Sequence, residues 1–215
     1  MSTARTRRGI HVEARLTADV DRVWALTQTP ERHERWDVRF GRIRPTADGR
    51  FRYRRFGVSG TGEHSGERRR DDGSATSALR FACTNPLSPI EEGSGYWRYR
   101  PLDGGGTEFA TGYDYRSRHP RIDRVFRPLM AWGTAWSFDR LRLWADRGLP
   151  PELTAAVALL DVMVRVAVVL AVAVLGGGPL GVGAAALLGV LALRVPALPW
   201  APSARRTTWS TGDVR

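Results

Sequence analysis

The sequence contains no lysine, one cysteine and four histidines, and each shortage excludes a class of site. All 33 basic residues are arginine, so the net charge of +11 and the pI of about 11.2 do not by themselves indicate nucleic-acid binding. Cys83 alone cannot build a disulfide framework or a site with several thiolate ligands. His11, His33 and His64 have no cysteine or second histidine at ligand spacing, so we predict no metal ion and no cofactor.

Charge is scarce in one long stretch near the end of the sequence. Residues 153–193 carry only Asp161 and Arg165, whereas residues 1–150 are rich in arginine and acidic residues. This boundary predicts a soluble domain over residues 1–150, a two-helix transmembrane hairpin over 151–200 and a short, basic, disordered tail over 201–215. Residues 1–16 contain no apolar run that would form a signal peptide, so we expect the domain to lie in the cytoplasm.

Residue spacing along the first 148 positions predicts an α+β fold. Alternation over residues 8–16 indicates a half-buried strand, and Asp19 and Pro30 begin two short helices. Residues 38–116 read as strands and turns, and residues 121–147 have helical spacing, with Pro128 either kinking the helix or marking its start. A meander of this kind forms a curved antiparallel sheet, and we expect the long helix to cover it and leave a cavity.

Several segments resemble one known superfamily. Residues 11–40, HVEARLTADVDRVWALTQTPERHERWDVRF, contain its opening pattern, which here is Ala18, Asp19 and Val20, then Val23 and Trp24, then Pro30 through Trp36 and Asp37. With the later segments EGSGYWRYRP, GYDYR and FRPLMAWGTAWSFDRLRLW, the sequence resembles the START-like superfamily (SRPBCC; polyketide cyclase/dehydrase and lipid transport), in a bacterial subgroup with an apolar tail. The resemblance covers about residues 9–148. It implies a helix-grip fold, with the antiparallel curved sheet wrapped on a long C-terminal helix and an apolar helical hairpin after it.

The resemblance further implies a hydrophobic or amphiphilic ligand held between the sheet and the helix. Candidate ligand-binding residues lie on the concave strand faces, on the facing helix and at the mouth of the second strand: Trp36, Asp37, Arg39, Tyr53, Phe81, Trp97, Tyr99, Phe109, Tyr113, Tyr115, Trp132 and Trp136. The alternative is that the aromatics only pack the core and that Asp37 and Arg39 form a local ion pair. Tyrosines are the better candidates, because a buried phenol needs a hydrogen-bond partner.

Two functions fit this reading. The first is a membrane-anchored carrier or binding protein for a lipid or similar small molecule. The second is an aromatase/cyclase or dehydrase-type enzyme in which Tyr113, Tyr115, Arg55 and Asp37 orient a polyketide-like substrate. Nucleic acid is disfavoured as a partner because the arginines are interleaved with acidic residues.

The apolar tail predicts a membrane element. Residues 153–175 are long enough to cross ~30 Å of hydrocarbon, and residues 179–195 form a second, shorter apolar helix. Arginines flank both ends, which favours a multi-pass hairpin in the inner or plasma membrane with the domain in the cytoplasm. Small residues recur at Gly181, Ala185 and Gly189, a spacing that also suggests a homo-oligomer contact. The charges of Asp161 and Arg165 leave open a hairpin that lies in the interface or packs on the domain.

Overall fold

The structure, a computed structural model, describes residues 8–46, 49–55 and 57–213. Its elements follow one another in the order β1 (Arg8–Leu16), α1 (Val20–Gln28), α2 (Pro30–Trp36), β2 (Arg42–Pro45), β3 (Arg50–Arg55), β4 (Val58–Arg69), β5 (Ala75–Ala82), β6 (Ile90–Pro101), β7 (Thr107–Ser117), α3 (Pro120–Arg147), α4 (Pro151–Leu175), α5 (Gly178–Arg194), η1 (Ala204–Arg206) and β8 (Thr208–Asp213). This order confirms the predicted α+β fold.

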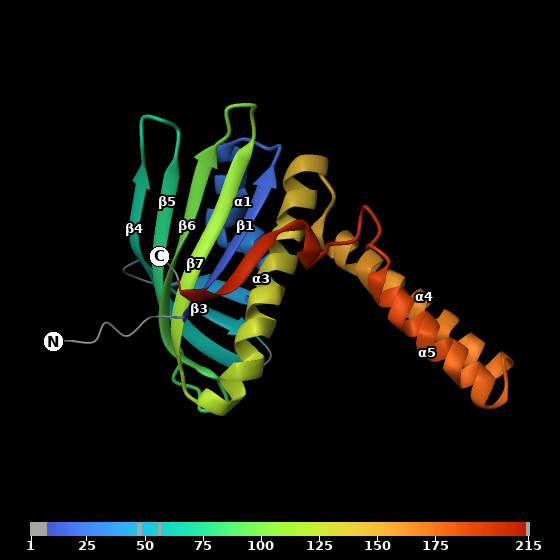
Figure 1. Cartoon of the computed structure of the whole chain (residues 1–215). Helices are drawn as coiled ribbons and strands as arrows, with labels where there is room; N and C mark the ends of the chain where they lie inside the picture. Colours follow the sequence, from blue (N-terminus) through green and yellow to red (C-terminus); the bar gives the residue numbers. More distant parts are fainter. Residues whose placement is uncertain (1–7, 47–48, 56, 214–215) are drawn as a thin grey trace.

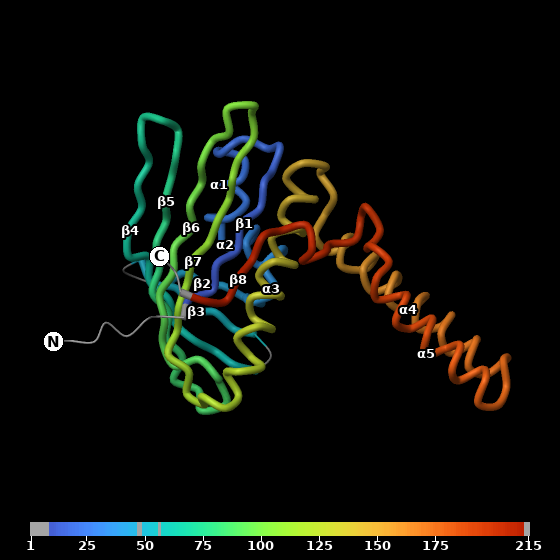
Figure 2. Tube along the Cα trace, viewed as in Figure 1, coloured from blue at the N-terminus to red at the C-terminus, as the bar shows by residue number. Residues whose placement is uncertain are grey.

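One antiparallel sheet of eight strands forms the body of the domain, in the order β2-β3-β4-β5-β6-β7-β1-β8. Figure 1 shows the sheet curving around one side of α3, and Figure 2 shows α1 and α2 at the end of the sheet nearer the start of the hairpin. The long helix α3 crosses the β1 side of the sheet and contacts β1 and β8. The chain therefore has the helix-grip fold, with an apolar hairpin following α3.

Local signals explain where the helices begin and end. The Asp19 carboxylate accepts a hydrogen bond from the backbone N–H of Arg22 at 2.7 Å and caps α1. Pro30 occupies the first turn of α2, where its missing N–H costs nothing. Helix α3 runs as a single element through Pro128 and ends at Gly148, whose left-handed φ of 68° suits glycine. Pro128 therefore does not mark the beginning of the helix, which lies at Pro120.

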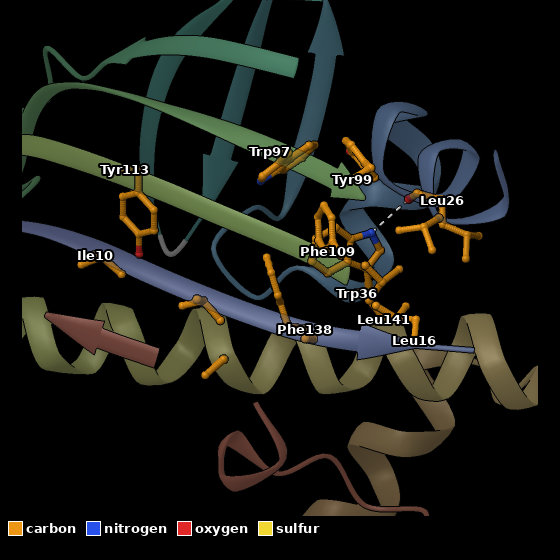
Figure 3. Packing of buried hydrophobic residues seen from close by; sticks show 14 of the residues in the cluster. Ile10, Leu16, Leu26, Trp36, Trp97, Tyr99, Phe109, Tyr113, Phe138 and Leu141 are labelled. Carbon is orange, nitrogen blue, oxygen red and sulfur yellow. Dashed lines mark hydrogen bonds between the residues drawn. The ribbon is translucent and has the colours of Figure 1, made fainter. Parts of the chain in front are cut away.

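The core fills the space between β1, β6, β7 and α3 (Figure 3). Trp36 is fully buried, and its indole N–H donates to the Leu26 carbonyl at 3.0 Å. Phe109 stacks on Phe138 of α3 with ring centroids 4.6 Å apart. Tyr99 is also fully buried, and its hydroxyl lies 2.6 Å from the hydroxyl of Thr27. Packed aromatic side chains thus occupy much of the region where we expected a cavity beneath α3.

The face of α3 that meets the sheet is lined by small residues. Ala131 and Ala135 are fully buried there, whereas Trp132 is 48% exposed and points away from the core. The expectation that Trp132 faces the ligand from α3 is therefore wrong. Small side chains allow the helix to approach the bulky aromatics of the sheet, which would clash with a tryptophan.

Residues 204–206 and 208–213 form a helical turn and a strand, which corrects the prediction of a disordered tail for this part of 201–215, whereas residues 214 and 215 lie outside the described residues. Strand β8 pairs antiparallel with β1, with Trp209 opposite Val12. The backbone N–H of Ser203 and the guanidinium of Arg206 both donate to the buried Asp139 carboxylate, at 2.8 and 3.1 Å. The chain therefore returns to the domain after the hairpin and adds an edge strand to its sheet.

The hairpin is held to the domain at both of its ends and packs along its own length. At its entry, Arg35 of α2 forms a two-bond ion pair with Glu152 at 2.8 and 2.9 Å. Gly181 and Ala185 of α5 are buried against α4, with a Cβ at Gly181 falling 3.2 Å from the Ala173 carbonyl oxygen. The small-residue face predicted as an oligomer contact is thus used inside the chain.

Candidate functional site

Glycines opposite aromatic side chains shape the concave face of β3, β4, β5 and β6. A Cβ at Gly62 would fall within 2.3 Å of the Phe51 ring, and one at Gly93 within 2.5 Å of the Phe81 ring. Tyr53 lies across Gly60 in the same way. These rings therefore lie flat on the neighbouring strand and form a shallow apolar floor, instead of standing upright and filling the space above it.

A partly open cavity of about 180 Å³ lies beside Phe51, on the side of the sheet covered by α1 and α2. Its walls are mostly apolar, with a few polar side chains among them: Thr27, Gln28, Pro30, His33, Phe40, Ile43, Pro45, Thr46, Gly49, Arg50, Phe51, His64, Leu79 and Trp97. None of these residues belongs to α3, so the prediction of a cavity between the sheet and the C-terminal helix is wrong for this cavity. It lies between the sheet and α2 because aromatic packing already fills the space under α3.

His33 forms one wall of the cavity and belongs to a buried charged cluster. Its Nε2 lies 3.1 Å from Oδ2 of Asp37, one turn further along the chain, and donates to that carboxylate. Arg39 donates hydrogen bonds to the same carboxylate from Nε at 2.9 Å and from Nη2 at 2.6 Å. The Asp37 side chain is 0% exposed, His33 9% and Arg39 11%. Asp37 and Arg39 therefore form the local ion pair that we considered as the alternative to ligand binding. This ion pair orients His33.

Electrostatics keep this cluster ionised around a neutral histidine. Burial lowers the pKa of His33, and the hydrogen bond to Asp37 opposes this only in part. Burial alone would raise the pKa of Asp37, but the Arg39 guanidinium and the hydrogen bond from His33 hold it well below its usual range. No hydrogen bond joins the second ring nitrogen of His33 to any residue in the described part of the chain. That nitrogen therefore remains able to accept a proton.

Three of the tyrosine hydroxyls that we considered for ligand binding, those of Tyr99, Tyr113 and Tyr115, are engaged with protein groups. The Tyr113 hydroxyl lies 2.9 Å from the Thr134 hydroxyl, and Arg39 stacks over the Tyr113 ring at 5.2 Å. The Tyr115 hydroxyl donates to Asp123 at 2.6 Å. Burial raises the pKa of Tyr53 to about 12, so this phenol stays protonated at neutral pH. These contacts account for the phenols of Tyr99, Tyr113 and Tyr115 without a ligand.

A second, open cleft of about 1390 Å³ adjoins the cavity and shares Thr46, Arg50 and Phe51 with it. Phe81, Tyr115 and the first turns of α3 line the cleft together with charged residues of β3 to β7. Arg52 and Arg80, both exposed, lie at its edge and form no ion pair with any residue that the structure describes. The cleft is thus lined by aromatic side chains and by charged side chains of both signs, among them Glu63, Glu92 and Arg116.

The structure distributes the twelve predicted site residues over the cavity, the cleft, the cluster at His33, the core and the surface of α3. Trp97 lines the cavity, and Phe81 and Tyr115 line the cleft. Asp37 and Arg39 lie behind His33, and Tyr53 packs against Phe40 on the floor. The others belong to the core or to the surface of α3: Trp36, Tyr99, Phe109 and Tyr113 are buried in the core, Trp136 lies under Arg140, and Trp132 is exposed.

Sequence reasoning missed His33 as a site residue. Its spacing from Asp37 in the segment PERHERWD places the two on one side of a helical turn, and this signal was available. Phe40, His64 and Gln28 carried no local signal, because long-range packing brings them together. Among the described residues, no group of three or more His, Cys, Asp or Glu side chains is arranged to hold a metal ion.

Comparisons with known proteins agree with this architecture. No family model matches the chain. The uncharacterized membrane protein YndG of Bacillus subtilis (strain 168) is 39% identical over 158 residues, which cover 66% of this chain and 59% of that protein. This chain thus spans about three fifths of the length of its relative. Helix α4 is long and apolar enough to cross a membrane, whereas α5 is shorter.

Solved structures share the fold at low sequence identity. A hypothetical protein of Helicobacter pylori superposes with a TM-score of 0.54 at 18% identity, over 66% of this chain and 90% of that one. A truncated norcoclaurine synthase from Thalictrum flavum gives a TM-score of 0.47 at 12% identity, over 67% and 96%. At such identities the likeness concerns the fold alone.

Proposed function

We propose that this protein is a membrane-anchored, START-like binding protein that takes a small amphiphilic molecule into the cavity beside His33. The observation that carries the proposal is a partly open, largely apolar cavity with a few convergent polar groups, one of which, His33, has a lowered pKa. Such a combination is typical of ligand sites. Residues 1–150 form the binding domain in this proposal, and residues 151–200 form the anchor.

The shape of the site favours a ligand with two unlike ends. A volume of about 180 Å³ is smaller than the roughly 300 Å³ at which ligand pockets usually begin, so the cavity holds only part of the molecule. The apolar part fits between Trp97 and Leu79, and the rest passes over Phe51 into the open cleft. The charged side chains that line the open cleft suit a polar head.

A second candidate, an enzyme, is favoured by one specific observation. Asp37 orients His33 and leaves one ring nitrogen free at the cavity wall, an arrangement that suits a general base. Tyr113 and Tyr115 do not support the predicted cyclase or dehydrase chemistry, because their hydroxyls are bonded to Thr134 and Asp123. A binding protein therefore fits the site better than a polyketide enzyme.

Native mass spectrometry of the full-length protein, released from detergent micelles after extraction from membranes, tests the binding site. The variant Leu79→Trp places an indole in the cavity, and Thr76→Trp places one on the outer face of the same strand. We expect a small-molecule adduct on the wild type and on Thr76→Trp that Leu79→Trp has lost. An unliganded wild type, or equal occupancy of both variants, would refute the proposal.

The hairpin ends support a topology in which the domain lies on one side of the membrane. Both ends are tied to the same domain, at Glu152 through Arg35 and at Arg206 through Asp139. Helix α5, with 17 residues, extends about 25 Å, which is close to the lower limit for a span. Flanking arginines favour the cytoplasmic side for the domain, and we propose that α4 and α5 both span.

Labelling of an introduced cysteine tests this topology in intact cells. In a Cys83→Ala background, Leu180→Cys lies at the hairpin tip, where Leu180 is 87% exposed, and Gly104→Cys lies on the domain. A membrane-impermeant maleimide should label position 180 and leave position 104 unlabelled until the cells are opened. Protection of both positions would mean that the hairpin enters only one leaflet, and labelling at 104 would reverse the orientation.

A further inference from the structure

The first half of α3 carries an apolar stripe that no part of the described chain covers. Its members follow at intervals of three and four residues and are all exposed: Ile122 by 54%, Val125 by 74%, Leu129 by 57% and Trp132 by 48%. The second half of the same helix buries Phe138 and Leu141 completely. The exposed stripe is therefore a separate surface of the helix and not the edge of the core.

Positive charge flanks this stripe. Arg121 and Arg124 are exposed and form no ion pair with any residue in the described ranges, whereas Arg127 on the sheet side pairs with Asp114 and Asp123. A helix with an apolar face, a tryptophan and flanking arginines has the composition of helices that lie in the membrane interface. Anionic headgroups would complement the two free guanidinium groups.

The loop before β6 lies close to the start of α3 and carries a further exposed apolar side chain. Leu87 is 82% exposed, and the loop is tied to the segment that leads into α3, where the Arg118 N–H donates to the Pro89 carbonyl at 2.8 Å. In Figure 1, α3 lies between the sheet and the hairpin. The first half of α3 lies toward the lower end of the domain, and the hairpin extends toward the same end. A bilayer entered by the hairpin would thus pass close to this stripe.

We infer that the stripe of Ile122, Val125, Leu129 and Trp132, with Leu87 beside it, docks on the anionic surface of the bilayer that holds the hairpin. The inference rests on the membrane anchoring in the proposed function. Docking places the open cleft, which the first turns of α3 help to line, next to the headgroup region. An amphiphile can then pass between bilayer and cleft over a short distance.

Fluorescent labels at single cysteines in the full-length protein test this contact. In the Cys83→Ala background, an environment-sensitive probe is attached at Val125→Cys, at Gly104→Cys on the distant β6–β7 turn, or at Leu180→Cys on the hairpin tip. The protein is reconstituted in vesicles of equimolar phosphatidylcholine and phosphatidylglycerol that carry a lipid-bound quencher. We expect severalfold quenching at 125 and 180 and none at 104. Changing Arg121 and Arg124 to glutamine should weaken quenching at 125 alone.

The probe positions separate failure of this inference from failure of the anchor. Quenching at 180 without quenching at 125 would overturn the docking, whereas absence of quenching at both would overturn the membrane anchor itself. The probe at position 125 would be shielded from water by a second copy of the chain if its emission changes with the protein-to-lipid ratio and does not respond to the quencher. That result would assign the stripe to a contact between two copies. Equal quenching in phosphatidylcholine alone would overturn the part assigned to the two arginines.

Discussion

Replacing Asp37 with asparagine is expected to destabilise the protein far more than the same change at Asp21. Asp37 is wholly buried and is bonded to Arg39 and His33, so the substitution leaves the Arg39 charge buried without its counter-charge. Removing one partner of a buried ion pair costs about 3 kcal/mol or more. For a protein of this size that loss lowers the unfolding midpoint by roughly 6–12 °C.

The control and the measurement follow from the surroundings of the two aspartates. Asp21 pairs with Arg69 at 2.7 Å, but its side chain is 82% exposed, and exposed ion pairs contribute little net stability. Thermal unfolding of the full-length protein in detergent can be followed by tryptophan fluorescence, because Trp36 stacks on His33.

Changing Arg39 to glutamine together with Asp37→Asn should restore part of the lost stability, since no unpaired charge then remains buried. This recovery separates the effect of charge from a change in packing. A fall in the unfolding midpoint no larger than that of Asp21→Asn would refute the reasoning, because it would mean that water reaches the cluster and screens it.

Three further predictions concern pH, packing and the hairpin. Burial lowers the pKa of His33 in the folded state, so on acidification the unfolded state binds the proton first, and the stability of the fold should decrease as the pH drops below about 6.5. In a pH titration of the unfolding midpoint, His33→Gln should flatten this part of the curve. Gly62→Ala should cost about 1–3 kcal/mol in chemical unfolding, because its Cβ would meet the Phe51 ring, whereas Gly66→Ala, with open space around it, should not destabilise. Arg165→Leu should reduce the amount of protein that resists carbonate extraction more than Asp161 and Arg165 changed together to leucine, because the single change leaves Asp161 without its partner in an apolar setting.

Much of the fold follows from local patterns that the sequence displays openly. Alternation over residues 8–16 became β1, Asp19 caps α1, and the helix expected over residues 121–147 is α3. Strand β8 escaped prediction because Thr208–Asp213, TWSTGD, has little apolar alternation. Its strand conformation is supported by pairing with β1, some two hundred residues earlier in the chain, which a local pattern does not reveal.

The candidate site was less accessible to sequence reasoning, for a different physical reason. Helical spacing identifies apolar stripes on α3 but not which one meets the sheet, and we placed Trp132 on the wrong side. The inner stripe consists of small residues such as Ala131 and Ala135, because Trp36 and Phe109 already occupy the space opposite. Alternation along β3 and β5 did place Tyr53 and Phe81 on the concave face, but it did not show that these rings lie flat over Gly60 and Gly93 of the neighbouring strands.

The position of β8 after the hairpin also sets an order of events during synthesis. Domains generally form from the N-terminal side as the chain emerges, so β1 is made early and its outer edge stays open until residues 208–213 arrive. By then α4 and α5 have left the ribosome and, in the membrane-anchored arrangement that we propose, have entered the membrane. An open strand edge invites pairing with other chains. In the proposed arrangement, β8 therefore covers the edge of β1 only after the anchor has been inserted.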